Sequence, residues 1–237
     1  LTGSNFDDNE DKTTGGRNGF GAKLANIFST EFIVETADSE RGLQYTQVFR
    51  NNMSVTEKPV IKKFKGADFT CITFKPDLAR FKMTCLEADI VALMGKRVYD
   101  MAGSNKMGRL AVFLNSERVD IKSFKEYIQL YKGSDSESAG FEELIAFETC
   151  NARWEIGVGV SDGSFHQVSF VNSICSSKGG THVQFIADQI TNRLVAAVKK
   201  KNGGVEVKAA NIRNHLFVCV NALITNPTFD SQTKDAL

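Results

Sequence analysis

The sequence lacks several features that would narrow its function at once. The formal net charge is only +1 over 237 residues, so any contact with nucleic acid must come from a local basic patch. No apolar run approaches the roughly 20 residues that a helix needs to cross a bilayer, and we expect no membrane partner. There are three prolines, with no proline-rich linker or periodic repeat. The 42% hydrophobic and 24% charged fractions are those of an ordinary globular protein with one large or two modest cores.

Neither the cysteines nor the acidic residues near the start of the chain predict a metal site. The five cysteines are scattered, odd in number and without a C-x-x-C pair, which indicates reduced intracellular thiols and not a disulfide framework or a zinc site. Asp7, Asp8, Glu10 and Asp11 are interpreted as a solvated acidic stretch, with metal binding as the alternative. The cysteines are Cys71, Cys85, Cys150, Cys175 and Cys219.

A glycine-rich segment, residues 15–23, is the most informative feature that is present. It reads Gly-Gly-Arg-Asn-Gly-Phe-Gly-Ala-Lys, and Leu24, Ile27 and Phe28 follow at helical spacing. Glycines beside an apolar-periodic segment predict a backbone that turns tightly and exposes its N–H groups at the positive end of a helix, where a polyphosphate can bind. The alternative is a glycine-rich turn that caps a surface helix.

The segment matches neither of the two common phosphate-binding motifs. The P-loop pattern fails because an alanine separates Gly21 from Lys23 and a leucine stands where the magnesium-binding hydroxyl should be. The dinucleotide fingerprint fails because the glycines are spaced Gly-x-x-Gly-x-Gly, and because residues 3–14 are polar where a strand should precede. A polar segment that leads into these glycines indicates a lid that closes over a phosphate chain.

Longer segments, in order and over essentially the whole chain, resemble the eukaryotic DNA topoisomerase II family (type IIA), whose ATPase domain belongs to the GHKL superfamily. The resemblance implies an α+β fold, in which residues 1–118 form the C-terminal part of a GHKL (Bergerat) ATPase α/β sandwich. Residues 119–237 would form a transducer domain with a ribosomal-protein-like βαβ fold, truncated at its C-terminus. The matching segments are residues 2–8, 15–23, 25–30, 69–74, 169–173, 178–182 and 226–234.

The family implies the ATP-binding gate region of a double-strand-breaking isomerase, which couples ATP binding and hydrolysis to dimer closure and DNA strand passage. The parent enzyme would use ATP and Mg²⁺, act on double-stranded DNA as a homodimer, and work in the nucleus. In the family, the general-base glutamate and the magnesium-holding asparagine precede the lid. Because the chain opens in the lid without an initiator methionine, we expect a fragment that does not hydrolyse ATP alone. The alternatives are a gyrase, chaperone or mismatch-repair ATPase, a GHKL kinase, or a nucleotide-free structural module.

The resemblance also implies which residues bind the nucleotide. Lys234, in a Gln-Thr-Lys loop with Gln232 and Thr233, would contact the terminal phosphate as the catalytic cation; alone, it would be interpreted as an exposed lysine in a polar turn. Thr73 would lie near the adenine, unless it only packs in a strand. Phe20 is expected to anchor the lid more than to touch the ligand. The phosphates and the nucleoside would be held by Gly3, Ser4, Asn5, Gly16, Arg17, Asn18, Gly19, Phe20, Gly21, Ala22 and Lys23.

A lysine triplet, Lys199, Lys200 and Lys201, has two interpretations. It ends a predicted helix, where cations complement the helix dipole. The family instead carries a lysine-rich loop here that contacts DNA, through salt-dependent phosphate contacts. His182 is interpreted as a structural residue at a helix start and not as a catalyst.

The patterns also predict individual elements. Alternation predicts strands near residues 32–36, 43–49 and 70–74, and a near-continuous apolar run predicts a central strand at 215–224. Segments 154–160 and 165–174 flank Asp162-Gly163, which predicts a β-hairpin. Apolar spacing predicts a helix over residues 185–198, and residues 134–140 a polar surface loop. A capping box of Thr84 and Glu87 predicts a long helix whose apolar face holds Leu86, Ile90, Leu93, Met94 and Met101.

Overall fold

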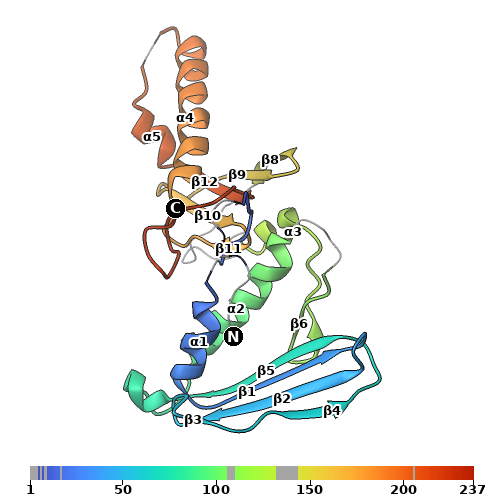
Figure 1. Cartoon of the computed structure of the whole chain (residues 1–237). Coiled ribbons are helices and arrows are strands. Elements are labelled where there is room, and N and C mark those ends of the chain that lie inside the picture. Colours follow the sequence, from blue (N-terminus) through green and yellow to red (C-terminus); the bar gives the residue numbers. More distant parts are fainter. Residues whose placement is uncertain are drawn as a thin grey trace. The chain divides into compact units, whose positions relative to one another are not determined.

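The computed structural model describes residues 5, 7, 10–16, 18–105, 110–131, 144–204 and 206–237. The chain divides into two compact units, one with Gly16–Val91 and the residues before Asp8, the other with Asp8–Gly15 and Ala92–Leu237 (Figure 1). It therefore passes between the units three times: after Asp7, at the Gly15–Gly16 peptide bond, and inside helix α2 (Ala88–Ser104). The domain boundary expected between residues 118 and 119 stays a prediction. The loop expected at residues 134–140 lies outside the described residues.

The first unit is built around an antiparallel sheet in the order β3-β2-β1-β5, with β4 also paired to β2. The sheet carries a row of phenylalanines: Phe32 is opposite Phe49 on one side and Phe74 on the other, and its ring contacts both. Phe32 and Phe49 are buried, whereas Phe74 is 46% exposed. The three predicted strands are confirmed, because each contributes one of these rings. The elements are α1 (Phe20–Ile27), β1 (Ser29–Asp38), β2 (Leu43–Arg50), β3 (Val55–Thr56), β4 (Val60–Lys63), β5 (Phe69–Pro76) and the 3-10 helix η1 (Leu78–Phe81).

The predicted start of the long helix is wrong, and most of its predicted apolar face is not buried. Helix α2 begins at Ala88, and Thr84 lies in a bend before it, so the predicted capping box does not form. Leu86 precedes the helix, and of the predicted apolar face Leu93, Met94 and Met101 are 51%, 47% and 45% exposed. Periodicity identifies an apolar face, but it does not determine which part of the helix is packed. The buried residues instead lie in the last turns and are Asp100, Ala102, Gly103 and Ser104.

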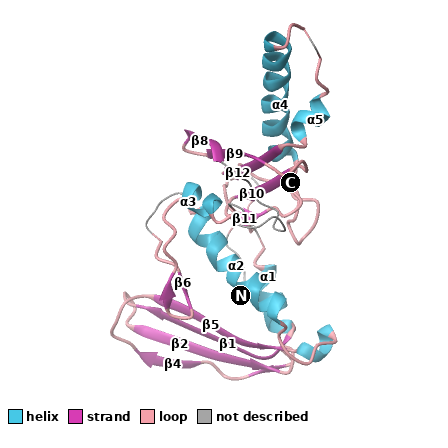
Figure 2. Ribbon diagram, turned by 180° about the vertical axis from the view of Figure 1, so that it is seen from behind, coloured by secondary structure: helices cyan, strands magenta, loops and turns pink. Residues whose placement is uncertain are grey.

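The second unit is built around a sheet in the order β11-β10-β12-β9-β8 (Figure 2). Strand β12 (Leu216–Ala222) is buried along its whole length, which confirms the predicted central strand. It pairs parallel to β10 and antiparallel to β9. The other strands are β8 (Leu144–Asn151), β9 (Trp154–Val160), β10 (His166–Val171) and β11 (Ile174–Cys175).

The predicted hairpin between β9 and β10 is wrong, because β12 lies between these strands. The turn itself exists: the Ser164 N–H donates to the Asp162 carboxylate, and Gly163 has a φ of 103°. A strand that is apolar on both faces is most stable in the middle of a sheet. The later strand β12 therefore lies between β9 and β10 and pairs with both. The turn at Asp162-Gly163 connects β9 to β10 past β12.

Alternate residues of β12 contribute to two cores, one on each face of the sheet. Phe217 and Cys219 pack with α3 (Phe124–Gln129), in a cluster that includes Tyr127 and Phe170. Leu216, Val218, Val220 and Ala222 pack with α4 (Thr181–Lys201), which confirms the predicted helix over residues 185–198. Because α4 connects the parallel strands β10 and β12, the three form a βαβ unit.

The remaining elements of the second unit are short. Helix α5 (Ala209–Arg213) lies beside α4 in both views (Figures 1 and 2). Strands β6 (Phe113–Leu114) and β7 (Glu117–Arg118) form a small hairpin. Among the described helices, none has the length and apolar character to span a bilayer.

Candidate functional site

The glycine-rich segment leads into a helix whose first turn is open. Gly19, with a φ of 66°, precedes α1, no side chain caps the helix, and its first turn has no acidic residue. A Cβ at Gly21 would meet nothing within 4 Å. Since the first N–H groups of a helix have no partner within it, this end of α1 presents donors and positive potential to an anion.

The side chains around this turn are not fully buried. Phe20 is 48% exposed, and the Lys23 side chain makes no hydrogen bond or ion pair with another described residue. Asn5 Nδ2 lies 3.4 Å from the carbonyl oxygen of Gly16, to which it donates. Gly3, Ser4 and Arg17, which the resemblance also assigns to the nucleotide, lie outside the described residues.

Lys234 contacts the first residue of the glycine-rich segment. Its Nζ donates to the carbonyl oxygen of Gly15 at 2.6 Å, although the two residues are 219 positions apart. Its backbone is left-handed, with a φ of 60°, and its N–H donates to Ser231 in a tight turn. Gln232 and Thr233, beside it, are exposed. The structure thus brings together two of the predicted parts, the lysine of the Gln-Thr-Lys loop and the start of the glycine-rich segment.

The matching segment at residues 178–182 anchors this loop. The Lys178 N–H donates to the Asp235 carbonyl at 2.9 Å, and the Leu237 N–H donates to the Gly179 carbonyl at 3.2 Å. Gly180 has a φ of 139°, and a Cβ there would lie 2.5 Å from the Leu237 carbonyl oxygen. Only glycine allows this close approach of two backbones. The two glycines of this segment therefore fix the chain that follows Lys234.

Two ionisable groups beside the loop have shifted pKa values. The Thr233 hydroxyl, helped by the charge of Lys178, holds the pKa of Asp235 below its usual value despite partial desolvation. Burial lowers the pKa of His182 to about 4. His182 is therefore neutral at physiological pH, and its Nε2 lies 3.2 Å from the Ser176 hydroxyl. Its position in the core favours the structural interpretation.

Two asparagines that the sequence analysis did not assign also contact the lid. Asn172 donates to the Thr14 carbonyl and Asn226 exchanges hydrogen bonds with Lys12. Both lie within segments that carry the resemblance. Each has a left-handed backbone, with φ values of 51° and 47°. Asparagine is favoured in that conformation, so the conformation explains the residue type but not the contact.

The other predicted residues lie elsewhere in the two units. Thr73 is exposed on β5, opposite Ile33 of β1. The lysine triplet is the last turn of α4, and Lys199 forms an ion pair with Glu206 at 2.6 Å. Lys200 and Lys201 are exposed and form no ion pair within the described part of the chain. Dipole complementation and DNA contact are both compatible with this position.

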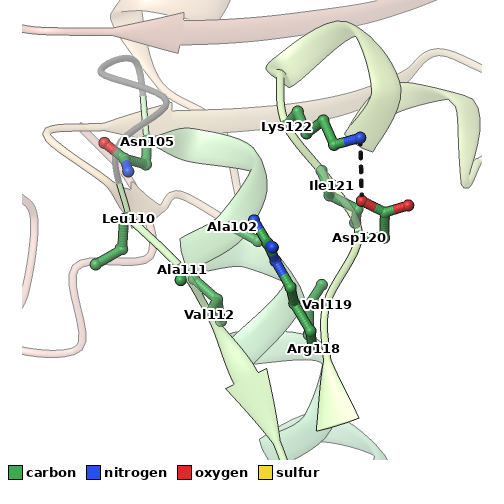
Figure 3. A pocket seen from close by; sticks show the side chains of 10 residues that line it. All are labelled: Ala102, Asn105, Leu110, Ala111, Val112, Arg118, Val119, Asp120, Ile121 and Lys122. Carbon is green, nitrogen blue, oxygen red and sulfur yellow. Dashed lines mark ion pairs between the residues drawn. The ribbon is translucent and has the colours of Figure 1, made fainter.

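A small pocket of about 30 Å³ lies at the end of α2 (Figure 3). Its wall includes Arg118, and Asp120 and Lys122 form an ion pair at 3.4 Å. No residue that the sequence assigns to the nucleotide or to DNA lines it. Across the described ranges, no group of three or more His, Cys, Asp or Glu side chains is placed to hold a metal ion.

Comparison with known proteins identifies the family. A family model described as DNA gyrase B matches residues 123–237. DNA topoisomerase 2 of Arabidopsis thaliana is 56% identical over 240 residues, which cover all of this chain and 16% of that protein. The chain thus spans about a sixth of the length of this curated relative.

Two solved structures match over all of this chain. One is the ATPase region of Saccharomyces cerevisiae topoisomerase II bound to ICRF-187, with a TM-score of 0.90, 49% identity and 60% of that chain covered. The other is the ATPase and transducer domains of DNA topoisomerase II from Balamuthia mandrillaris, with a TM-score of 0.89, 48% identity and 59% of that chain covered. These matches confirm the predicted fold class, and the chain belongs to the eukaryotic DNA topoisomerase II family as a segment of its ATPase and transducer region.

Proposed function

We propose that this chain is the ATP-binding gate region of an ATP-hydrolysing type II DNA topoisomerase, which breaks and rejoins both DNA strands. One observation carries the proposal: Lys234 Nζ lies 2.6 Å from the carbonyl oxygen of Gly15, directly before the glycine-rich loop. We infer from it that a triphosphate held by the backbone amides that follow Gly15 would also be bound by this cation from the other end of the chain.

Phosphoryl transfer requires positioning and charge neutralisation more than covalent chemistry by the protein. The amides of residues 16–22 and the Lys23 ammonium would hold the phosphates. Lys234, with Gln232 and Thr233 beside it, would stabilise the charge that develops on the terminal phosphate. Ser4 and Asn5 would contact the nucleoside, Gly3 beside them would also bind the nucleotide, and Thr73 would lie near the adenine.

Mg²⁺ would accompany the triphosphate and neutralise part of its charge. The described residues hold no group of three or more His, Cys, Asp or Glu side chains that could bind it, and we assign no metal ligand in this chain. The open first turn of α1, without an acidic residue, fits a polyphosphate better than it fits a cation.

ATP would favour the conformation in which Lys234 and the glycine-rich loop bind it together, because a ligand shifts a conformational equilibrium only by its differential affinity. In the parent enzyme this change would close a homodimer around double-stranded DNA and allow strand passage in the nucleus. Lys199, Lys200 and Lys201 would contact DNA phosphates without sequence preference. The 56% identity to a segment of DNA topoisomerase 2 of Arabidopsis thaliana supports the assignment to this enzyme.

ATP hydrolysis by the full-length enzyme tests the proposal. Lys234→Ala should lower kcat/KM for ATP by about 10- to 100-fold, because a charge-assisted contact contributes about 1.5–3 kcal/mol. Lys58→Ala changes an exposed lysine that is not assigned to the nucleotide, and it should leave kcat/KM for ATP unchanged. Equal activity of the two variants would disprove the role of Lys234.

A further inference from the structure

Residues 10–15, here called the strap, pack with the second unit, whereas the glycine-rich loop that follows packs with the first. The strap is thus a part of the lid that belongs to the second unit, although the rest of the lid belongs to the first. The contacts that hold the strap therefore fix the position from which the glycine-rich loop starts.

Asn226 binds the strap through its backbone and its side chain. Its N–H donates to the Lys12 carbonyl at 2.9 Å, and its Oδ1 accepts from the Lys12 N–H at 3.3 Å. Its Nδ2 donates to the Asp11 carboxylate at 3.3 Å. A single residue therefore satisfies both backbone groups of Lys12, as a strand partner would.

Asn172 binds the next part of the strap. Its Nδ2 donates to the Thr14 carbonyl at 3.4 Å and to the Ile224 carbonyl at 2.8 Å, and its Oδ1 accepts from the Ile224 N–H at 2.8 Å. The bonds to Ile224 fix the amide plane of a side chain that is 8% exposed. The donor that faces Thr14 is therefore held in place by the chain just after β12.

Gly15, the last residue of the strap, is enclosed on two sides. A Cβ on it would lie 2.2 Å from Ile174 Cδ1, so the backbone sits directly against β11. Its carbonyl accepts the bond from Lys234. The next peptide bond takes the chain into the other unit.

We propose that Asn172 and Asn226 are positioning residues for ATP binding, which hold the strap on the second unit so that the loop starts beside Lys234. The inference rests on the proposed function. Neither residue is assigned to touch ATP; both act through residues 11–15. Without them, the start of the loop must be ordered when ATP binds, which weakens binding.

The test uses the full-length enzyme and Asn226→Asp. The new carboxylate keeps the acceptor for the Lys12 N–H, loses the donor, and repels Asp11. We expect KM for ATP to rise about three- to tenfold, the effect of one lost hydrogen bond, with kcat within about twofold because the reacting atoms are not contacted. In a double variant that also carries Asp11→Asn, the new amide at position 11 can donate to the new carboxylate at position 226. The hydrogen bond is thus restored with its direction reversed, and KM should return to the wild-type value.

Asn51→Asp is the matched control, because Asn51 also has a left-handed backbone, with a φ of 50°, and its side chain bonds to no other described residue. It should leave KM unchanged. The inference is overturned if Asn226→Asp behaves like Asn51→Asp, or if Asp11→Asn fails to rescue it. If Lys234→Ala impairs hydrolysis in the same assay, only the role of the asparagines fails; if Lys234→Ala has no effect, the proposed function fails.

Discussion

The packing of α2 on α3 makes two glycines of one helix respond in opposite directions to the same substitution. In Gly103→Ala the added Cβ would lie 2.3, 2.4 and 2.5 Å from three atoms of Tyr127. In Gly95→Ala the nearest atom would be Leu114 Cδ2 at 3.8 Å, an ordinary contact. Both glycines lie in α2, so the comparison isolates packing from helix propensity.

The magnitudes decide the two signs. Alanine stabilises a helix interior by about 0.5–1 kcal/mol relative to glycine, and this is the whole effect expected at Gly95. At Gly103, Tyr127 must move, but its hydroxyl donates to Asp100 Oδ1 at 2.6 Å in a cluster with Lys96 and Tyr131. Burial also raises the pKa of Tyr127, which keeps it a donor. Overpacking costs about 1–3 kcal/mol and a lost buried bond to a charged group about 1.5–3 kcal/mol, so a net loss of about 1.5–5.5 kcal/mol is expected once the gain in helix propensity is subtracted.

Thermal unfolding of the purified protein measures both effects. At about 2–4 °C per kcal/mol for a chain of this size, Gly103→Ala should lower the melting temperature by about 3–22 °C, and Gly95→Ala should raise it by about 1–4 °C. Shifts of the same sign, or a Gly103→Ala variant at least as stable as wild type, would refute the packing argument.

Two further predictions concern pH and DNA. Burial lowers the pKa of His182 to about 4 from an ordinary 6.5, so the unfolded chain binds the proton more readily; the free energy of unfolding should fall by up to about 3 kcal/mol as pH drops from 6.5 to 4. His182→Gln should flatten that part of a denaturant-measured stability profile, and an unchanged slope would argue against the assignment. Replacing Lys199, Lys200 and Lys201 together by alanine in the full-length enzyme should weaken the stimulation of ATP hydrolysis by DNA, most strongly at low salt, without changing hydrolysis in the absence of DNA. If DNA stimulates ATP hydrolysis by this variant as fully as by the wild type, the three lysines do not contact DNA and only complement the helix dipole.

Elements whose own pattern of apolar residues shows how they are buried could be predicted from the sequence. Strand β12 is apolar at nearly every position, and only a strand covered on both faces is stable with that pattern. The β9–β10 hairpin was wrong because the turn at Asp162-Gly163 is a local signal, whereas strand order depends on which later strand is the better neighbour. The start of α2 was wrong for a related reason: the spacing of Thr84 and Glu87 fits a capping box, but the chain bends there instead.

The candidate site likewise has parts that the sequence could predict and parts that it could not. The glycine-rich loop and Lys234 belong to recognisable motifs, so the sequence could name them. The contacts of Asn226 with Lys12 and of Asn172 with Thr14 join residues 214 and 158 positions apart, and no local pattern encodes such pairs. Position 180 likewise requires glycine for a reason that no local pattern shows, because a Cβ there would clash with the backbone of Leu237, far along the chain.

The most direct measurement is a crystal structure of the parent protein with a nonhydrolysable ATP analogue. We expect Lys234 Nζ to lie within hydrogen-bond distance of a terminal phosphate oxygen, with the amides of residues 19–22 around the phosphates. A triphosphate bound elsewhere, or bound at the loop with Lys234 directed away from it, would disprove the proposed function.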